Sequence, residues 1–213
     1  PRHPRCSGVS WARDVYKRQI QSIPRDDAPG SLREASIRAI DAFASSGIGV
    51  WQILPLNPPD FVGSPYASPS AFAMDPELLH GLAGDFSDPS RHDLDAWLEN
   101  SEWADPWALF RILKSIDPRS WVKWGPWSNP SGRDLERLRS DNEEHYWREI
   151  SIQWKLENAM RSIETHAREN GVLLLGDIPL YVAHDSADMW HSKELFNIGP
   201  NGEPLERSGA PPD

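Results

Sequence analysis

The sequence predicts an α/β fold built on a parallel sheet or barrel. Two stretches carry this prediction, residues 48–56 and 171–182, and both follow one plan: a helix ends at glycine, an apolar strand follows, and a proline stands at its carboxyl end. In the second stretch, residues 172–175 are apolar without alternation, as in a strand buried on both faces. Asp177 follows at the carboxyl end of that strand, where α/β proteins build their active sites.

Composition narrows the class of protein. The 213 residues are 38% hydrophobic and include 11 Trp, which suffices for a core. The net charge of -10 argues against a nucleic-acid partner and against an anionic membrane surface. No apolar run reaches the length of about 18 residues that a membrane span needs, and the single cysteine, Cys6, excludes an internal disulfide framework. With no secretory signal visible, we expect a cytoplasmic enzyme.

Residues 1–19 differ from the rest of the chain. Their start is basic in an acidic protein and shows no period, and residues 12–19 resemble the translated library-adapter scars of metagenome-derived sequences. We predict that residues 1–19 are non-native and exclude them from fold reasoning, so that the native start is missing or overwritten. The alternative interpretation is a short basic tail.

The first predicted helix begins at Ser31. The four residues from Ser31 to Glu34 fit a capping box, and Leu32, Ile40 and Phe43 share one helical face. Residues 45–47 end this helix, and the strand of residues 48–56 follows.

More than a hundred residues separate the two predicted strands, whereas a simple crossover needs about a dozen. We therefore predict a mostly helical insertion at about residues 80–140, within a domain that spans residues 20–213. The expected elements are a short helix at 93–99, a helix at 107–116 capped by Asp105, a tryptophan-dense loop at 120–127, one long helix at 141–169, a short helix starting within 183–190, and a turn at 199–204.

Three features have a functional and a structural interpretation. Asp177 either binds substrate hydroxyls or orients a catalytic group, or it caps a helix or loop. Tyr66, presented by the loop that starts at Ser64, either stacks on a sugar or packs in the turn. The rings of Trp121, Trp124 and Trp127 form either a carbohydrate platform or, the favoured interpretation, a small satellite core.

The positions of His184, Asp188 and His191 allow a shared helical face, but no third histidine or cysteine accompanies them. We therefore prefer a helix start to a metal site, and we predict no metal. The chain also lacks a Walker loop, a dinucleotide fingerprint, a nucleophile elbow and a Cys-x-x-Cys pair, so no cofactor is predicted.

Four motifs carry a family resemblance. They lie at residues 51–56, 64–73, 176–190 and 209–213, in an order and spacing similar to those of the 4-α-glucanotransferases, the amylomaltase or disproportionating-enzyme family. The resemblance covers residues 31–213.

The resemblance implies the N-terminal part of a (β/α)8 TIM barrel with helical insertions between barrel strands. It implies an enzyme that transfers α-1,4-glucan segments between maltooligosaccharides by a retaining mechanism, with a carboxylate nucleophile and a carboxylic acid/base. By similarity, Asp177 lies beside the donor sugar after the third barrel strand, Tyr66 packs against that sugar with Ser64 beside it, and Asp213 begins a loop over the acceptor side.

The departures from the family pattern concern catalysis. This sequence lacks three features of the family: the stretch that carries the nucleophile, the acid/base glutamate, and the third essential aspartate. We therefore assign no catalytic residue and expect the fragment alone to be inactive. The alternatives are a non-catalytic glucan-binding module that uses the tryptophan-rich surface, and a fragment of an α-amylase-type hydrolase. A partial barrel also predicts an open sheet edge and poor solubility.

Overall fold

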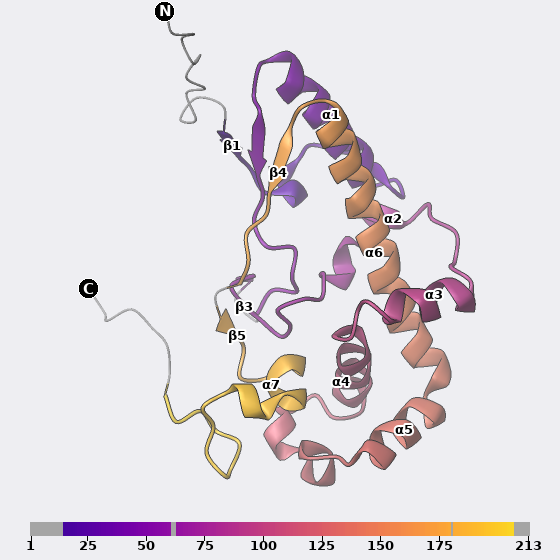
Figure 1. Cartoon of the computed structure of the whole chain (residues 1–213), viewed down its shortest axis with the longest axis vertical. Helices are drawn as coiled ribbons and strands as arrows, with labels where there is room; N and C mark the ends of the chain where they lie inside the picture. Colours follow the sequence, from indigo (N-terminus) through magenta and orange to yellow (C-terminus); the bar gives the residue numbers. More distant parts are fainter. Residues whose placement is uncertain (1–14, 61–62, 180, 207–213) are drawn as a thin grey trace, which may run out of the picture.

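The computed structural model describes residues 15–60, 63–179 and 181–206. Three short strands form a parallel sheet at one end of the molecule (Figure 1), namely β1 (Val15–Lys17), β2 (Val50–Gln52) and β4 (Leu173–Leu175). Their order is β1-β2-β4, so β2 is central and pairs with both neighbours. The mixed α/β fold and its parallel strands agree with the sequence prediction, although β2 is shorter than the predicted strand at 48–56.

Residues 15–17 belong to the fold, which corrects their exclusion. They form β1 and pair in register with β2. The Tyr16 ring lies 4.8 Å from that of Phe43, and the indole nitrogen of Trp51 donates to the carbonyl of Arg18 at 3.0 Å. Strand β1 needs only an extended backbone and an aromatic side chain that packs on Phe43, so residues 15–17 can form it whether or not they are native. That residues 1–19 are non-native stays a prediction. Cys6 lies outside the described residues.

β4 is an edge strand within the described part of the chain, as the expected open sheet edge requires. Its burial was wrongly predicted, because Leu173 is 60% and Leu175 48% exposed while Leu174 packs toward the core. Alternation appears because helices cover only one face of this sheet.

One hydrophobic cluster, which surrounds Trp51 and is called the upper core, covers that face of the sheet with its helices. α1 (Ser31–Ser45), α2 (Leu79–Ala83) and the C-terminal half of α6 (Glu143–Glu169) pack with β2 around the fully buried Trp51.

A second hydrophobic cluster, called the lower core, lies at the other end of the molecule in Figure 1. It contains α3 (Arg91–Leu98), α4 (Ala104–Ile116), α5 (Gly132–Asp141), α7 (Ala187–His191) and the N-terminal half of α6. Short 3₁₀ helices lie at Ile20–Ser22, Pro76–Leu78, Trp121–Lys123, Gly125–Ser128 and Lys193–Leu195.

α6 runs through both cores. Tyr146 and Ile150 pack in the lower core, and Leu156 and Ile163 in the upper core. Between them, Gln153 is fully buried, and its amide both donates to the carbonyl oxygen of Met74 and accepts from its backbone nitrogen, each at 2.9 Å. A buried amide is stable only when both of its ends are hydrogen-bonded, so Gln153 fixes the segment at Met74 against the middle of α6.

Helix starts differ from the sequence prediction in a consistent way. The capping box at Ser31 and Glu34 does not form: α1 begins after Gly30, whose φ of 76° suits glycine, and the Ser31 hydroxyl donates to the carbonyl of Asp26 at 2.9 Å. Capping boxes form instead at Ser90 of α3 and Ser131 of α5, each with an aspartate at the third helical position. Aspartate thus takes the place that Glu or Gln occupies in the usual capping box.

Asp105 is not the cap of α4, since that helix begins one residue earlier. Its Oδ1 accepts from the Arg139 guanidinium at 2.5 Å and from the Tyr146 hydroxyl at 2.7 Å, which ties α4 to α5 and α6. The long helix predicted at 141–169 is confirmed as α6, which begins two residues later because Asn142 separates it from α5. None of the helices in the described residues is both long and apolar enough to cross a membrane.

We predict that Gln153→Ala lowers the free energy of unfolding by about 1–3 kcal/mol, because two backbone groups of Met74 lose their partner. The measurement is the urea midpoint at unchanged m-value. Asn158→Ala is the matched control on the same helix: Asn158 donates only to the Trp154 carbonyl, so its loss should cost no more than about 0.5 kcal/mol. Equal effects of the two variants would contradict the role of Gln153.

We further predict that the exposed edge of β4 drives self-association. Replacing both Leu173 and Leu175 by Lys should reduce the concentration-dependent increase of mass in sedimentation, because charged side chains on an edge strand oppose edge-to-edge pairing. Leu195→Lys, at a position 76% exposed outside the sheet, is the control. The prediction is wrong if the control suppresses association as strongly as the double variant.

Candidate functional site

A second, two-stranded parallel sheet brings two distant loops together. β3 (Ala67–Ser68) pairs with β5 (Tyr181–Val182), and Ala67 lies opposite Tyr181. Each strand adjoins a loop that was singled out in the sequence. As a result the Tyr66 hydroxyl donates to Oδ2 of Asp177 at 3.1 Å across 111 positions of sequence.

The loop before β3 holds Tyr66 by local hydrogen bonds. Gly63 adopts a φ of 84°, a left-handed conformation that favours glycine, and turns the chain back. The backbone nitrogen of Ser64 then donates to Oδ1 of Asp60 at 2.8 Å, and the Ser64 hydroxyl accepts from the nitrogen of Tyr66 at 3.3 Å. Ser64 therefore positions Tyr66, and the Tyr66 ring remains 37% exposed rather than packed into the turn.

Asp177 is half-buried in the loop that leaves β4. Its Oδ1 accepts from the backbone nitrogen of Ile178 at 3.0 Å, while Oδ2 accepts from Tyr66. It does not cap a helix, because the N-cap of α7 is Ser186, whose hydroxyl accepts from the nitrogen of Met189. A carboxylate has about four acceptor positions, so Asp177 retains acceptors for a ligand.

The hydrogen bond to Asp177 raises the pKa of the Tyr66 phenol above its ordinary value, and the negative charge of Asp177 adds to this effect. Ionisation of the phenol would remove the donor and place two negative charges side by side. Tyr66 thus stays a protonated donor throughout the neutral range. The pair combines an exposed aromatic face with a fixed carboxylate, a combination that suits a hydroxyl-rich ligand.

The segment after β3 is held from both sides. The amide of Asn57 donates to the carbonyls of Ser70 and Ala73, each at 3.1 Å, and Oδ2 of Asp188 accepts from the nitrogen of Ala71 at 3.1 Å. Burial raises the pKa of the Asp188 carboxyl. Sequence reasoning missed the supporting role of Asn57, for which no periodicity or spacing gives a signal.

His184, Asp188 and His191 do not converge. A ring nitrogen of His184 lies 2.8 Å from the carbonyl oxygen of Gly202, whereas Asp188 binds the backbone of Ala71. The preferred interpretation, a helix start, is confirmed by the Ser186 cap. Across the described ranges, no cluster of three or more His, Cys, Asp or Glu is arranged to hold a metal ion.

The tryptophan-dense segment belongs to the lower core. Trp121 and Trp124 are 2% and 6% exposed, and their indole nitrogens donate to the carbonyls of His184 and Asp117 at 2.7 and 2.9 Å. Trp127 is partly buried against the same cluster. The satellite-core interpretation is confirmed, and a platform formed by these three rings is wrong.

Comparison with known proteins identifies the family of this chain. The model of the 4-alpha-glucanotransferase family matches residues 18–84 and 77–213. The chain belongs to the 4-alpha-glucanotransferase family.

Individual relatives of this family cover the chain almost completely. The 4-alpha-glucanotransferase of Aquifex aeolicus is 27% identical over 91% of this chain and 48% of its own length, and that of Synechocystis is 26% identical over 98% and 50%. A solved structure, the amylomaltase from Streptococcus agalactiae in complex with acarbose, matches with a TM-score of 0.81 at 22% identity, over 94% of this chain and 50% of its own. The chain therefore has the fold of the matched half of that amylomaltase. The chain spans about half the length of these relatives.

Of the residues that the glucanotransferase resemblance assigned to the substrate, the structure brings Ser64, Tyr66 and Asp177 together. Asp213 lies outside the described residues. The contact between Tyr66 and Asp177 matches the expected proximity, and their binding roles stay predictions.

We predict that Asp177→Asn lowers the pKa of Tyr66 toward that of an ordinary tyrosine. With the charge removed, the protonated phenol loses its preferential stabilisation, so ionisation begins at lower pH. Ultraviolet or NMR titration can follow this change, since the chain has only 4 Tyr. Asp88→Asn, which removes a carboxylate that binds Lys155 of α6 and not the phenol, is the control. An unchanged Tyr66 titration in Asp177→Asn would contradict the contact.

Proposed function

We propose that this chain is part of a 4-α-glucanotransferase that moves α-1,4-glucan segments between maltooligosaccharides, and that Tyr66 and Asp177 form one wall of its donor-sugar site. The observation that carries the proposal is the hydrogen bond between these side chains, 111 positions apart, in a chain that matches the family model over residues 18–213. The acarbose complex of the structurally similar amylomaltase supports an oligosaccharide ligand.

The chemistry of the pair fits the early part of a retaining reaction. The Tyr66 ring offers a flat apolar surface to the C–H face of a sugar, and the Asp177 carboxylate accepts hydroxyl hydrogens of the same sugar. Ser64 holds the backbone on which Tyr66 stands. Such contacts orient the donor sugar, and hydrogen bonds to its hydroxyls that strengthen in the transition state contribute to the rate.

Asp177 is not the nucleophile in this proposal. A retaining enzyme needs two carboxyl groups about 5–5.5 Å apart across the scissile bond. Asp177 instead has a tyrosine hydroxyl and a backbone nitrogen as its described partners. The nucleophile and the acid/base group belong to the half of the relatives that this chain does not match.

The proposal also includes the fold of the whole enzyme, a (β/α)8 barrel of which this chain forms the first part. The sheet β1-β2-β4 contributes the first strands of a (β/α)8 barrel, with Asp177 following the third, and α1 and α6 lie on its outer face. The predicted insertion at about residues 80–140 corresponds to the segment that carries α3, α4 and α5, which build the lower core. Exposure of Leu173 and Leu175 on the other face of the sheet is consistent with an incomplete barrel interior.

The structure and the comparisons do not favour the two alternative functions, a glucan-binding module and an α-amylase-type hydrolase. A glucan-binding module that relies on the tryptophan-rich segment requires exposed rings, but Trp121 and Trp124 are buried. An α-amylase-type hydrolase is disfavoured because the matching family model and relatives are those of glucanotransferases.

We predict that the purified chain binds maltotriose but does not disproportionate it. Asp177→Asn should weaken binding about tenfold or more, because a hydrogen bond to a charged group contributes about 1.5–3 kcal/mol. Tyr66→Ala should weaken it about threefold to tenfold through lost stacking. Calorimetric titration measures both effects, and chromatography of the sugars measures transfer.

The control for binding is Ile116→Ala, which removes an exposed apolar side chain at the far end of α4. Equal affinities of Asp177→Asn and the wild-type chain would contradict the donor-site role. Turnover of maltotriose above a blank would show that the assignment of the catalytic carboxylates to the unmatched half is wrong.

A further inference from the structure

The loop after β3 is joined to the segment after β5 by a seam of backbone hydrogen bonds that continues the two-stranded sheet. The nitrogen of Ala183 donates to the carbonyl of Ser68 at 2.8 Å, and the nitrogen of Ala187 donates to the carbonyl of Pro69 at 2.9 Å. The seam therefore runs from the paired strands to the start of α7. The candidate donor site lies near its strand end, because Tyr66 directly precedes β3.

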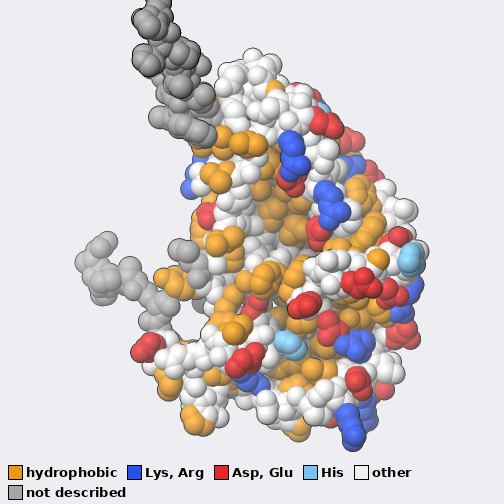
Figure 2. All heavy atoms as spheres, viewed as in Figure 1, with side chains coloured by type: hydrophobic (Ala, Val, Ile, Leu, Met, Phe, Trp, Pro, Cys, Tyr) orange, Lys and Arg blue, Asp and Glu red, His pale blue; other side chains and the backbone are white. Residues whose placement is uncertain are grey.

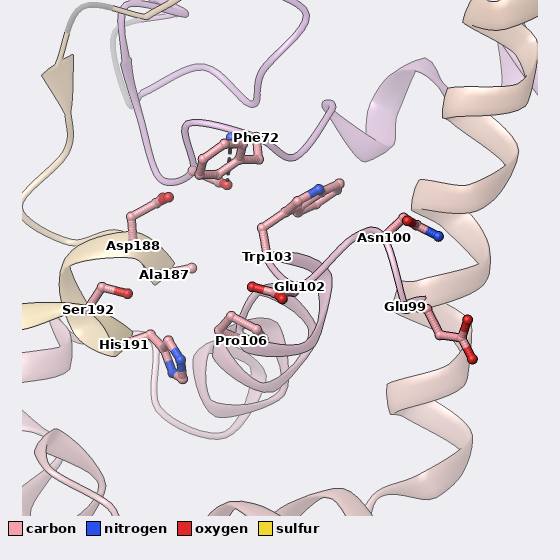
Figure 3. Close-up of a pocket in the computed structure, with 11 residues that line it drawn as sticks. Phe72, Glu99, Asn100, Glu102, Trp103, Pro106, Ala187, Asp188, His191 and Ser192 are labelled. Atoms are coloured by element: carbon pink, nitrogen blue, oxygen red, sulfur yellow. Dashed lines mark hydrogen bonds between the residues drawn. The ribbon is translucent and has the colours of Figure 1, made fainter. Parts of the chain in front are cut away.

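Asp188 of α7 closes the other end of this seam. Its Oδ2 accepts from the backbone nitrogen of Ala71 at 3.1 Å, and the carboxylate is directed toward the loop that bears Phe72 (Figure 3). The Ser70 hydroxyl also donates to this carboxylate. Ser70 is 2% exposed, and its oxygen in turn accepts from the nitrogens of Phe72 at 3.2 Å and Ala73 at 3.1 Å. One side chain of α7 thus orders the backbone of the loop after β3, directly and through Ser70.

The helix that carries Asp188 is itself anchored in the lower core. Trp190 of α7 is 2% exposed, and its ring lies 6.0 Å from those of Phe110 and Trp124. The indole nitrogen of Trp190 donates to the carbonyl of Trp127 at 2.8 Å. Asp188 therefore joins the loop after β3 to an element whose position the lower core fixes.

The surroundings of Asp188 indicate that its acceptor oxygens matter more than its charge. It faces a cleft of about 500 Å³, and the other titratable groups among the described residues that line this cleft are Glu99, Glu102 and His191, with no lysine or arginine. Burial raises the pKa of the Asp188 carboxyl, because the ionised form loses water without gaining a cation. The hydrogen bonds that the carboxylate accepts offset this cost. An uncharged side chain with the same acceptor oxygen would meet the same demand.

We propose that Asp188 is a positioning residue of the candidate donor site, one that sets the contact between Tyr66 and Asp177 from the far end of the seam. Among the described hydrogen bonds it makes none with either residue, and it acts through the loop that it binds at Ala71. Without this acceptor the loop is released from α7, and Tyr66 spends less time against Asp177. A consequence for sugar binding rests on the proposed function, whereas the effect on the Tyr66 contact does not.

The phenol of Tyr66 reports on this contact in the sugar-free chain, because its hydrogen bond to Asp177 raises its pKa. Asp188→Ala should lower the pKa of Tyr66, in the same direction as Asp177→Asn, since the loop loses its bond at Ala71. Asp188→Asn should leave that pKa unchanged, because the amide oxygen still accepts from Ala71. Ultraviolet titration measures both, and Tyr66→Phe identifies the signal of Tyr66 among the 4 Tyr of the chain.

Ser186→Ala is the matched control, because it removes the cap of α7 and leaves the bond between Asp188 and Ala71 in place. It should destabilise the chain without changing the Tyr66 titration. Near-ultraviolet circular dichroism checks folding, and Asp188→Ser, which also shortens the side chain, replaces Asp188→Ala if the latter does not fold. The positioning role is refuted if Asp188→Ala titrates like the wild-type chain, or if Asp188→Asn or Ser186→Ala lowers the Tyr66 pKa as much as Asp188→Ala does.

Calorimetric titration with maltotriose separates this inference from the proposed function. Asp188→Ala should weaken binding about twofold to tenfold, the equivalent of one hydrogen bond, and Asp188→Asn should bind like the wild-type chain. Wild-type affinity in Asp188→Ala together with weaker binding in Asp177→Asn would overturn the positioning role alone. No binding by the wild-type chain would contradict the proposed function, and the Tyr66 titration would then decide the role of Asp188.

Discussion

The buried amide of Gln153 is the interaction on which the arrangement of this chain depends. α6 passes from the lower core to the upper core, and Gln153 lies at the transition, hydrogen-bonded to both backbone groups of Met74. Met74 ends the loop that begins near Tyr66. The long helix therefore fixes the end of the loop that presents the candidate site, although no residue of α6 lies in that site. A buried amide is suited to this role because both of its hydrogen bonds form in only one register between the helix and the loop.

The backbone of the candidate site is anchored by hydrogen bonds, while its aromatic side chains are exposed. Parallel pairing of β3 with β5 and the bonds of Asn57 and Asp188 anchor the loops through backbone groups. Tyr66 and Phe72 remain exposed on this framework. Figure 2 shows that hydrophobic side chains are exposed at many places on the visible face of the molecule, interspersed with charged ones. Aromatic rings on anchored loops lose little freedom on binding, which favours sugar recognition by stacking.

Sequence reasoning succeeded where a local pattern carries the structural information. The glycine, apolar strand and proline plan located β2 and β4, and the resemblance placed Tyr66 near Asp177, a contact that the structure contains. It failed at β1, where a compositional argument excluded residues that the sheet accepts because of Tyr16 and its backbone. Burial of β4 was also wrong, because it depends on which elements cover the sheet rather than on the strand itself.

Contacts set by tertiary packing left no signal in the sequence. Phe72 and Trp103 lie on separate elements and meet only because Trp97 and α6 hold the start of α4 in place. Gln153 resembles any polar residue on a long helix until its partner at Met74 is known. Asp93 and Asp134 show the intermediate case, since a shorter carboxylate completes the same capping geometry as glutamate.

The most direct measurement of the central claim is an NMR titration of the isotope-labelled chain with maltotriose, mapped on backbone amides. We predict the largest shifts at residues 64–68 and 177–178, the two loops that meet through Tyr66 and Asp177. Shifts confined to other parts of the chain, or none at sugar concentrations that saturate binding, would contradict the assignment of these loops to the donor-sugar site.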